Sequence, residues 1–122
     1  MVNHNVLAKS FGYAFEGIKH AFSNNQNLRI ALGGAVFVVI ASIYFRVTPF
    51  EMGILGVMIL LVICAEMINT SIEEMTNLII NEHRREAKIA KDVSAGMVLI
   101  TLIGSIIVGF LVFIPYILRL IR

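Results

Sequence analysis

Apolar and polar positions follow one another along this chain in long blocks. Residues 28–45, 52–65 and 93–118 are almost continuously apolar, whereas residues 23–27, 46–51 and 81–92 are polar or turn-forming. Helices that cross a bilayer need about 20 mainly apolar residues, and a shorter apolar run can be completed by flanking residues that reach the interface. The pattern predicts three membrane-spanning helices, at about 28–45, 52–80 and 93–118.

Residues 6–22, ahead of these blocks, have a helical periodicity of their own. Leu7, Phe11, Phe15, Ile18 and Phe22 recur every three or four positions, with charged residues between them. A helix with one apolar and one charged face commonly lies in the membrane interface. We therefore expect an amphipathic surface helix at 6–22; an ordinary helix on a soluble core is the alternative. Because residues 1–27 are polar and amphipathic, we expect no cleavable signal peptide.

The composition supports a membrane environment. The chain has 122 residues, of which 58% are hydrophobic and 15% charged, and its mean hydropathy is +0.87. Soluble domains are about 45–50% apolar and about 25% charged, so one small core could not bury this excess. The predicted fold class is an all-α membrane protein with a single domain over residues 1–122. Nucleic-acid binding is not expected, because the basic residues form no long patch.

The basic residues are divided unevenly between the two sides of the predicted spans. Connections rich in Lys and Arg stay in the cytoplasm. The N-terminal side and the 81–92 connection hold Lys9, Lys19, Arg29, Arg84, Arg85, Lys88 and Lys91, and the opposite side holds Arg46, Arg119 and Arg122. We therefore expect a cytoplasmic N-terminus, a cytoplasmic 81–92 loop and a C-terminus on the outer side.

The second predicted span ends in polar residues. At about 100° per residue, Glu66, Asn69, Thr70, Glu73 and Asn77 fall on one narrow stripe of the helix. Such a stripe could join helices through hydrogen bonds in a non-catalytic assembly protein. Two glutamates about 10 Å apart along a helix, however, need cations or protons near them. The stripe therefore predicts a functional site that faces protein or a water-filled cleft.

Carboxylates beside the cation-rich 81–92 segment suit a site for Mg²⁺ and phosphate. Mg²⁺ prefers one or two carboxylates, with phosphate oxygens and water completing its shell. A carboxylate in a low-dielectric site can also accept a proton from an alcohol. These features predict a phosphoryl transferase, although the chain has neither GxxxxGK[ST] nor a kinase glycine-rich loop. A small ion-coupled transporter subunit is the alternative, because an intramembrane glutamate suits a proton-linked carrier.

One combination of motifs resembles a known family. The run Glu66-Met-Ile-Asn69-Thr-Ser-Ile-Glu73, followed by Ala90-Lys91-Asp92 and a third apolar helix, is similar to the prokaryotic diacylglycerol kinase family, which includes undecaprenol kinases. The segments GYAFEG at 12–17 and NLRI at 27–30 look like the family's as well. The resemblance covers nearly the whole chain.

The resemblance implies an integral membrane lipid kinase of the bacterial cytoplasmic (inner) membrane. It implies a homotrimer whose active sites are shared between neighbouring chains near the cytoplasmic surface, with ATP as co-substrate and Mg²⁺ as cofactor. The implied acceptor is a membrane lipid, either diacylglycerol or undecaprenol, and NLRI at 27–30 leans towards undecaprenol.

The resemblance also implies roles for individual residues. Glu66 matches the base that takes the proton of the lipid hydroxyl, Asn69 a polar residue that supports the site, and Glu73 a metal-binding glutamate. The residues implied at the nucleotide are Lys9, Tyr13, Asn25, Glu73, Glu82, His83, Arg84, Lys91 and Asp92.

The chain departs from the family pattern at three positions. Asn25 stands where the family has a second metal-binding glutamate, Asn77 where it usually has aspartate, and Ala31 where it often has glutamate or histidine. An amide oxygen can still bind Mg²⁺ without contributing charge, so the resemblance implies Glu73 and Asn25 as the metal ligands. A catalytically impaired member of the family is a further alternative.

Overall fold

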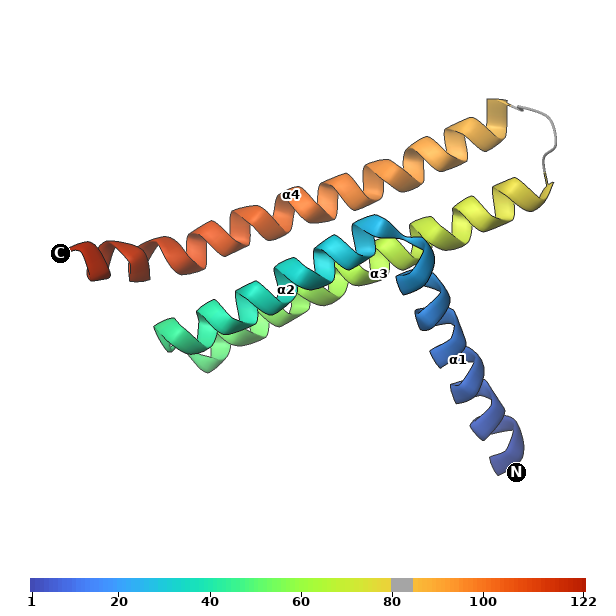
Figure 1. Ribbon diagram of the computed structural model, residues 1–122, viewed down its shortest axis with the longest axis horizontal. Helices are drawn as coiled ribbons and strands as arrows, with labels where there is room; N and C mark the ends of the chain where they lie inside the picture. Colours follow the sequence, from blue (N-terminus) through green and yellow to red (C-terminus); the bar gives the residue numbers. More distant parts are fainter. Residues whose placement is uncertain (80–84) are drawn as a thin grey trace.

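The computed structural model of the chain describes residues 1–79 and 85–122, which form four helices. These are α1 (His4–Asn24), α2 (Gln26–Phe45), α3 (Pro49–Ile79) and α4 (Arg85–Ile121), as shown in Figure 1. In the described ranges α2, α3 and α4 are each long and apolar enough to cross a membrane. This all-helical architecture fits the predicted membrane protein.

The helix α3 lies at the centre of the arrangement. It runs antiparallel to both α2 and α4, and α1 projects from the bundle at its junction with α2 (Figure 1). Helix α3 packs against each of the other three helices. The polar stripe of the sequence is therefore carried by the element that has the most neighbours in the fold.

The start of α3 is fixed by a reciprocal pair of hydrogen bonds. The Thr48 hydroxyl oxygen accepts from the Glu51 backbone N–H at 3.1 Å, and the Glu51 carboxylate accepts from the Thr48 N–H at 3.0 Å. Pro49 occupies the first helical position, where its fixed φ suits a helix and no N–H is needed. The helix consequently begins at Pro49, ahead of Met52, the position at which hydropathy placed it.

Helix α4 also begins earlier than the sequence pattern predicted. It starts at Arg85 rather than Val93, so residues 85–92 of the predicted 81–92 loop are helical. Residues 85–91 are mostly good helix formers, and Lys88 donates to Asp92 at 2.6 Å across one turn. Helical propensity thus continues α4 beyond its apolar segment.

The turn between α2 and α3 depends on Arg46. Its backbone has φ 52° and ψ 51°, the left-handed conformation that commonly ends helices. The Val47 N–H then donates to the Ser42 carbonyl at 3.2 Å, which satisfies a carbonyl at the end of α2. This closure reverses the chain within three residues, 46–48, between two long helices.

A cluster of aromatic and charged residues joins three helices at this same end. The Tyr116 hydroxyl of α4 donates to the Glu51 carboxylate of α3 at 2.5 Å. The Phe45 ring of α2 lies 6.1 Å from the Tyr116 ring and 6.1 Å from the Phe113 ring, measured between centroids. The Arg119 guanidinium lies 5.5 Å from the centre of the Tyr116 ring. The ends of α2, α3 and α4 are therefore held together far from the polar stripe.

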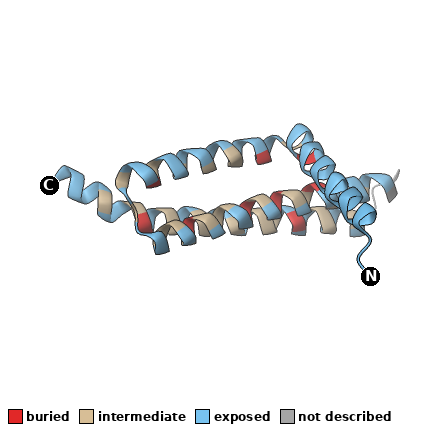
Figure 2. Cartoon of the chain, turned by 90° about the horizontal axis from the view of Figure 1, so that it is seen from below, coloured by how far each residue is buried: buried red, intermediate tan, exposed pale blue. Residues whose placement is uncertain are grey.

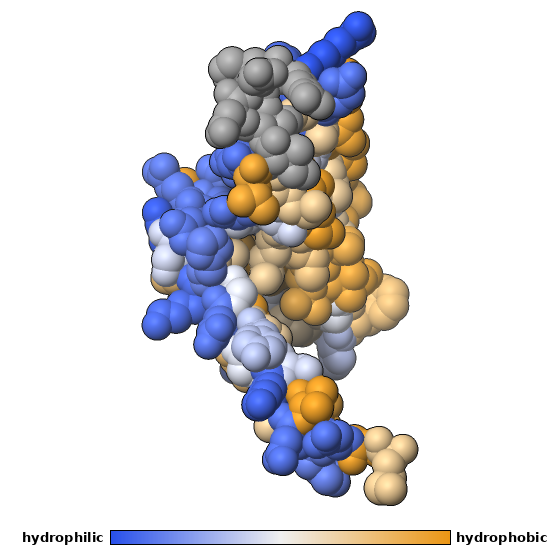
Figure 3. Space-filling view, turned by 90° about the vertical axis from the view of Figure 1, so that its right-hand side faces the viewer, coloured by the Kyte–Doolittle hydropathy of each residue, from blue (hydrophilic) through white to orange (hydrophobic). Residues whose placement is uncertain are grey.

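Little of the described chain is buried inside the single molecule. Figure 2 shows buried residues at scattered points where helices meet, with exposed or half-buried residues elsewhere. The buried residues are Ala21, Leu28, Ser42, Leu55, Val62, Ala65, Glu66, Thr70, Ser94 and Val112. In Figure 3, apolar side chains cover much of the visible bundle. An apolar surface of this extent requires lipid or other protein around it.

The predicted surface helix at 6–22 lies within α1. Its five periodic apolar residues are all exposed in the single chain. Figure 3 shows hydrophilic and apolar side chains interspersed along this arm of the molecule. Placement of α1 on a membrane surface therefore stays a prediction.

Candidate functional site

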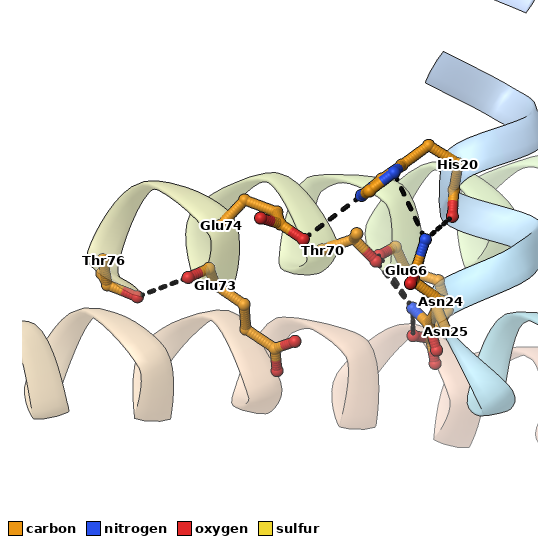
Figure 4. A network of polar contacts seen from close by, with 8 residues as sticks. All are labelled: His20, Asn24, Asn25, Glu66, Thr70, Glu73, Glu74 and Thr76. Atoms are coloured by element: carbon orange, nitrogen blue, oxygen red, sulfur yellow. Dashed lines mark hydrogen bonds and ion pairs between the residues drawn. The ribbon is translucent and has the colours of Figure 1, made fainter. Parts of the chain in front are cut away.

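Glu66 is a buried carboxylate on the central helix. Its side chain is 4% exposed, and it lies on the part of α3 that faces the junction of α1 and α2 (Figure 4). The Asn25 amide nitrogen donates to its Oε2 atom at 3.0 Å and to its backbone carbonyl at 3.3 Å. A buried carboxylate needs such partners, because leaving it unpaired is costly.

Thr70 completes this buried group. Its hydroxyl donates to the Glu66 carbonyl at 3.0 Å and accepts from the Asn25 amide at 2.9 Å. Asn25 therefore contacts both polar residues that α3 buries on this side. These contacts connect the junction of α1 and α2 to the predicted catalytic glutamate.

The other edge of the polar stripe faces α4. The Ser94 hydroxyl of α4 donates to the Asn69 amide oxygen at 2.7 Å, and the Asn69 amide nitrogen lies 3.4 Å from Glu73 Oε1. Ser94 is buried, whereas Glu73 is exposed. These hydrogen bonds connect α4 through Asn69 to Glu73, whose exposed carboxylate is accessible to ligands.

A cation lies one to two turns further along this edge. The Lys91 ammonium donates to the Asn77 amide oxygen at 2.7 Å and is therefore close to the C-terminal part of α3. Asp92, beside it in sequence, accepts from Lys88. The predicted polar stripe therefore has neighbours on two sides. Glu66 and Thr70 face the α1–α2 junction, whereas Asn69, Glu73 and Asn77 lie along α4.

A second connection holds α1 against α3. The His20 ring lies 3.2 Å from the Glu74 carboxylate, and Asn24 contacts the same ring at 3.2 Å. In Figure 4, Glu74 points towards His20 while Glu73 points away from it. Both partners are exposed, so this pair contributes little to stability. It lies where α1 approaches α3.

Some of the predicted site residues are not brought together. Lys9 and Tyr13 lie exposed on α1, away from the junction. Asn25 contacts Glu66 and Thr70, and it makes no hydrogen bond to the described side chain of Glu73, its predicted partner at a metal ion. The predictions for Glu82, His83 and Arg84 fall outside the described residues. Within residues 1–79 and 85–122, no group of three or more His, Cys, Asp or Glu side chains could hold a metal ion.

Sequence reasoning missed two residues of this region. The apolar pattern places Ser94 within the third span and predicts no role for it, although a small polar residue close after Lys91 and Asp92 is a usable signal. His20 was not assigned to the site, because its approach to Glu74 depends on the angle between α1 and α3. Both omissions concern contacts between helices, which periodicity within one helix does not report.

The arrangement has the parts needed to bring an alcohol and a phosphate together. A buried carboxylate can accept a proton, an exposed carboxylate one turn beyond Asn69 can bind a cation, and an ammonium group can balance phosphate charge. All of them lie along the end of α3 that follows its apolar segment. A membrane-embedded substrate and a water-soluble one could therefore meet on this helix.

Comparisons with known proteins agree with this reading. A family model described as prokaryotic diacylglycerol kinase matches residues 12–113. The chain is 35% identical over 115 residues to a protein of Synechocystis sp. named diacylglycerol kinase, and the alignment covers 93% of this chain and 66% of that protein. It is 32% identical over 111 residues to a protein of Bacillus subtilis named undecaprenol kinase, and there the alignment covers 91% of this chain and 90% of the relative.

Proposed function

The chain belongs to the prokaryotic diacylglycerol kinase family, and we propose that it transfers the γ-phosphoryl group of Mg–ATP to the hydroxyl of a membrane lipid. The observation that carries the proposal is Glu66, a carboxylate buried on a membrane helix and bonded by a side chain from another element. The family match favours this reading over an ion-coupled transporter.

Glu66 is proposed as the base of the reaction. It accepts the proton of the lipid hydroxyl as that oxygen attacks the γ-phosphorus atom and the bond to the leaving ADP breaks. Burial removes water that would compete with the lipid hydroxyl for the same carboxylate. Most of the rate acceleration is expected from holding the two substrates in line at this residue.

Glu73 is the described residue that best fits a metal ligand. Its carboxylate is exposed and, among the described residues, has one long contact, to Asn69. A bound Mg²⁺ would neutralise charge on the phosphate oxygens. Asn25, the other expected ligand, fits less well, because its amide oxygen accepts from the Leu28 N–H and its amide nitrogen faces Glu66.

The remaining nucleotide contacts are proposed by position. Lys91 and Asp92 lie at the start of α4, close to the end of α3, where they can reach phosphate oxygens or the nucleotide. Lys9 and Tyr13 lie on α1, and they would join the site when α1 or a neighbouring chain brings them near. Glu82, His83 and Arg84 keep their proposed nucleotide role from the family resemblance.

We further propose a homotrimer in the bacterial inner membrane with the N-terminus and the 81–92 segment in the cytoplasm. The distribution of basic residues supports this orientation. The exposure of Glu73 in the single chain supports a site that a second copy closes. ATP, which is available in the cytoplasm, would then reach Glu73 and Lys91 from the water side.

The acceptor is proposed as diacylglycerol or undecaprenol. The two relatives carry one name each, and the NLRI segment at 27–30 leans towards undecaprenol. Both alcohols end in a hydroxyl at the membrane surface, so the same carboxylate could serve either. Selectivity would then depend on how the helices accommodate the lipid next to Glu66.

The test is a transfer assay on the purified protein in lipid. Radiolabelled γ-phosphate from ATP should appear on one of the two lipids and should require Mg²⁺. Glu66→Gln should reduce kcat by at least about a hundredfold, since general bases contribute about 10²–10⁴ in rate. Glu74→Gln, a matched change to an exposed glutamate on the same helix, should retain most of the activity.

The outcomes are distinct. Absence of transfer to either lipid across a range of Mg²⁺ concentrations would contradict the proposed function and favour an impaired family member. Transfer that survives Glu66→Gln would leave the kinase reading intact and would remove Glu66 from the role of base.

A further inference from the structure

Asn25 is the one residue between α1 and α2, and it ends one helix and begins the next. Its backbone has φ −111° and ψ 103°, which is extended rather than helical. Its N–H donates to the Ala21 carbonyl at 2.8 Å, and its side-chain oxygen accepts from the Leu28 N–H at 3.0 Å. The amide oxygen is therefore engaged as the N-cap of α2.

This cap sets which end of the amide faces α3. With the oxygen on the Leu28 N–H, the amide nitrogen points to Glu66 Oε2 at 3.0 Å and to the Thr70 hydroxyl at 2.9 Å. The reverse orientation would place N–H groups against an N–H and an oxygen against a carboxylate, which is unfavourable at both ends. Asn25 consequently presents donors to Glu66, and donors cannot bind a cation.

The contact also limits where the Glu66 carboxylate can lie. Glu66 and Thr70 are both buried on α3, and Asn25 approaches them from the junction between α1 and α2 (Figure 4). A glutamate side chain has three rotatable bonds, so a base on α3 alone could adopt several positions. A donor fixed by its own helix cap reduces these positions to the one observed.

We propose that Asn25 is a positioning residue for the transfer step, holding the Glu66 carboxylate towards the lipid hydroxyl instead of binding metal. The inference rests on the proposed role of Glu66 as the base. Asn25 would then act on the residue that deprotonates the lipid, and not on the nucleotide. The position of the Glu66 carboxylate would depend on the α1–α2 junction, where Asn25 lies.

Two substitutions separate the cap from the donor. Asn25→Ser keeps a good N-cap oxygen, adds no charge and removes the amide donors. Asn25→Gln keeps the amide donors and weakens the cap. Asn3→Ser, the same substitution at the exposed N-cap of α1, is the matched control. All three are measured in the full-length protein in lipid, together with thermal unfolding.

If Asn25 positions the base, Asn25→Ser should lower kcat by about tenfold or more, because small displacements of reacting groups have effects of this size. The KM for Mg–ATP and the free Mg²⁺ concentration for half-maximal rate should stay within about twofold of the wild-type values. Asn25→Gln should retain more activity than Asn25→Ser despite a lower unfolding temperature. Asn3→Ser should match the wild type.

Two results would overturn the inference. An Asn25→Ser enzyme with normal kcat, beside an impaired Asn25→Gln enzyme, would show that only the cap matters. A higher Mg²⁺ requirement in Asn25→Ser, corrected by Asn25→Asp, would show that residue 25 binds metal.

An infrared measurement keeps the test independent of turnover. The carboxylate stretching band of Glu66, identified by its loss in Glu66→Gln, should shift in Asn25→Ser and stay in place in Asn3→Ser. An unmoved band would contradict the proposed contact. If the wild type transfers phosphate to neither lipid, the proposed function has failed, and the infrared result still decides whether Asn25 holds Glu66.

Discussion

The Ser94 hydroxyl donates a 2.7 Å hydrogen bond to the Asn69 amide oxygen, joining α4 to α3 inside the bundle. This bond decides the orientation of the Asn69 amide, whose nitrogen is then left facing Glu73. Ser94 is buried at 3% exposure, so water cannot easily replace its hydroxyl. A residue of α4 therefore influences a proposed metal ligand of α3 without touching it.

Removal of this bond should be measurable in both stability and catalysis. Ser94→Ala leaves the Asn69 oxygen without its donor and should lower the free energy of unfolding by about 1 kcal/mol. It should also raise the Mg²⁺ concentration needed for half-maximal transfer, because Glu73 loses its support. The control is Ser105→Ala, which removes a hydroxyl that donates to the Leu102 carbonyl within its own helix. Equal effects of the two substitutions would refute the role assigned to Ser94.

Lys91 should affect nucleotide binding more than the chemical step. Lys91→Ala removes the ammonium group at the end of α3 that the proposal places near phosphate. We expect the KM for Mg–ATP to rise about tenfold, equivalent to about 1.4 kcal/mol of binding, with a smaller change in kcat. Lys19→Ala, an equal loss of charge on exposed α1, should leave the KM nearly unchanged. A Lys91→Ala enzyme with wild-type KM would exclude this residue from the nucleotide site.

The capping box of α3 should matter for stability alone. Thr48→Ala removes the oxygen that accepts the Glu51 N–H and should lower the free energy of unfolding by about 1 kcal/mol. Activity at equal folded fraction should not change, since Thr48 lies at the opposite end of α3's apolar segment from Glu66. Denaturant unfolding in a defined detergent gives the first quantity. Thr101→Ala, within a helix where alanine is favoured, serves for comparison and should not destabilise.

Arg46 offers a substitution that should stabilise the protein. Its left-handed backbone, φ 52°, is unfavourable for a residue with a Cβ atom and easy for glycine. Arg46→Gly should therefore raise the free energy of unfolding by about 0.5–1 kcal/mol after the greater flexibility of the unfolded chain is included. Arg46→Val should lower it, because β-branched residues tolerate this conformation poorly. If thermal unfolding ranks valine above glycine, the turn does not have the described conformation in lipid.

Periodicity and apolar length were sufficient to predict the three long apolar helices and the side of α3 that carries polar residues. Both properties belong to a single helix and can be determined directly from its sequence. The start of α3 was missed for a different reason. The sequence does contain a signal for this start, Thr48-Pro49 followed by Glu51, but it is a capping signal. Hydropathy alone predicts that the helix starts at Met52.

Contacts between helices were the part that the sequence did not predict. The orientation of the Asn25 amide depends on its cap and on the approach of α3, and neither follows from the residue type. The same holds for Ser94 with Asn69 and for His20 with Glu74. The metal role expected for Asn25 came from its position in a motif, while its contacts in the fold favour hydrogen bonding to Glu66.

The length of α3 has a consequence for the lipid environment. At 1.5 Å per residue, the helix from Pro49 to Glu66 is about 26 Å long, close to a hydrocarbon thickness of about 30 Å. In the proposed orientation the aromatic and charged cluster lies at the outer face of the bilayer, so a thicker bilayer would place Glu66 within the hydrocarbon and a thinner one would place it among the headgroups. The proposed transfer to one acceptor would then run at different rates in lipids of different acyl-chain length.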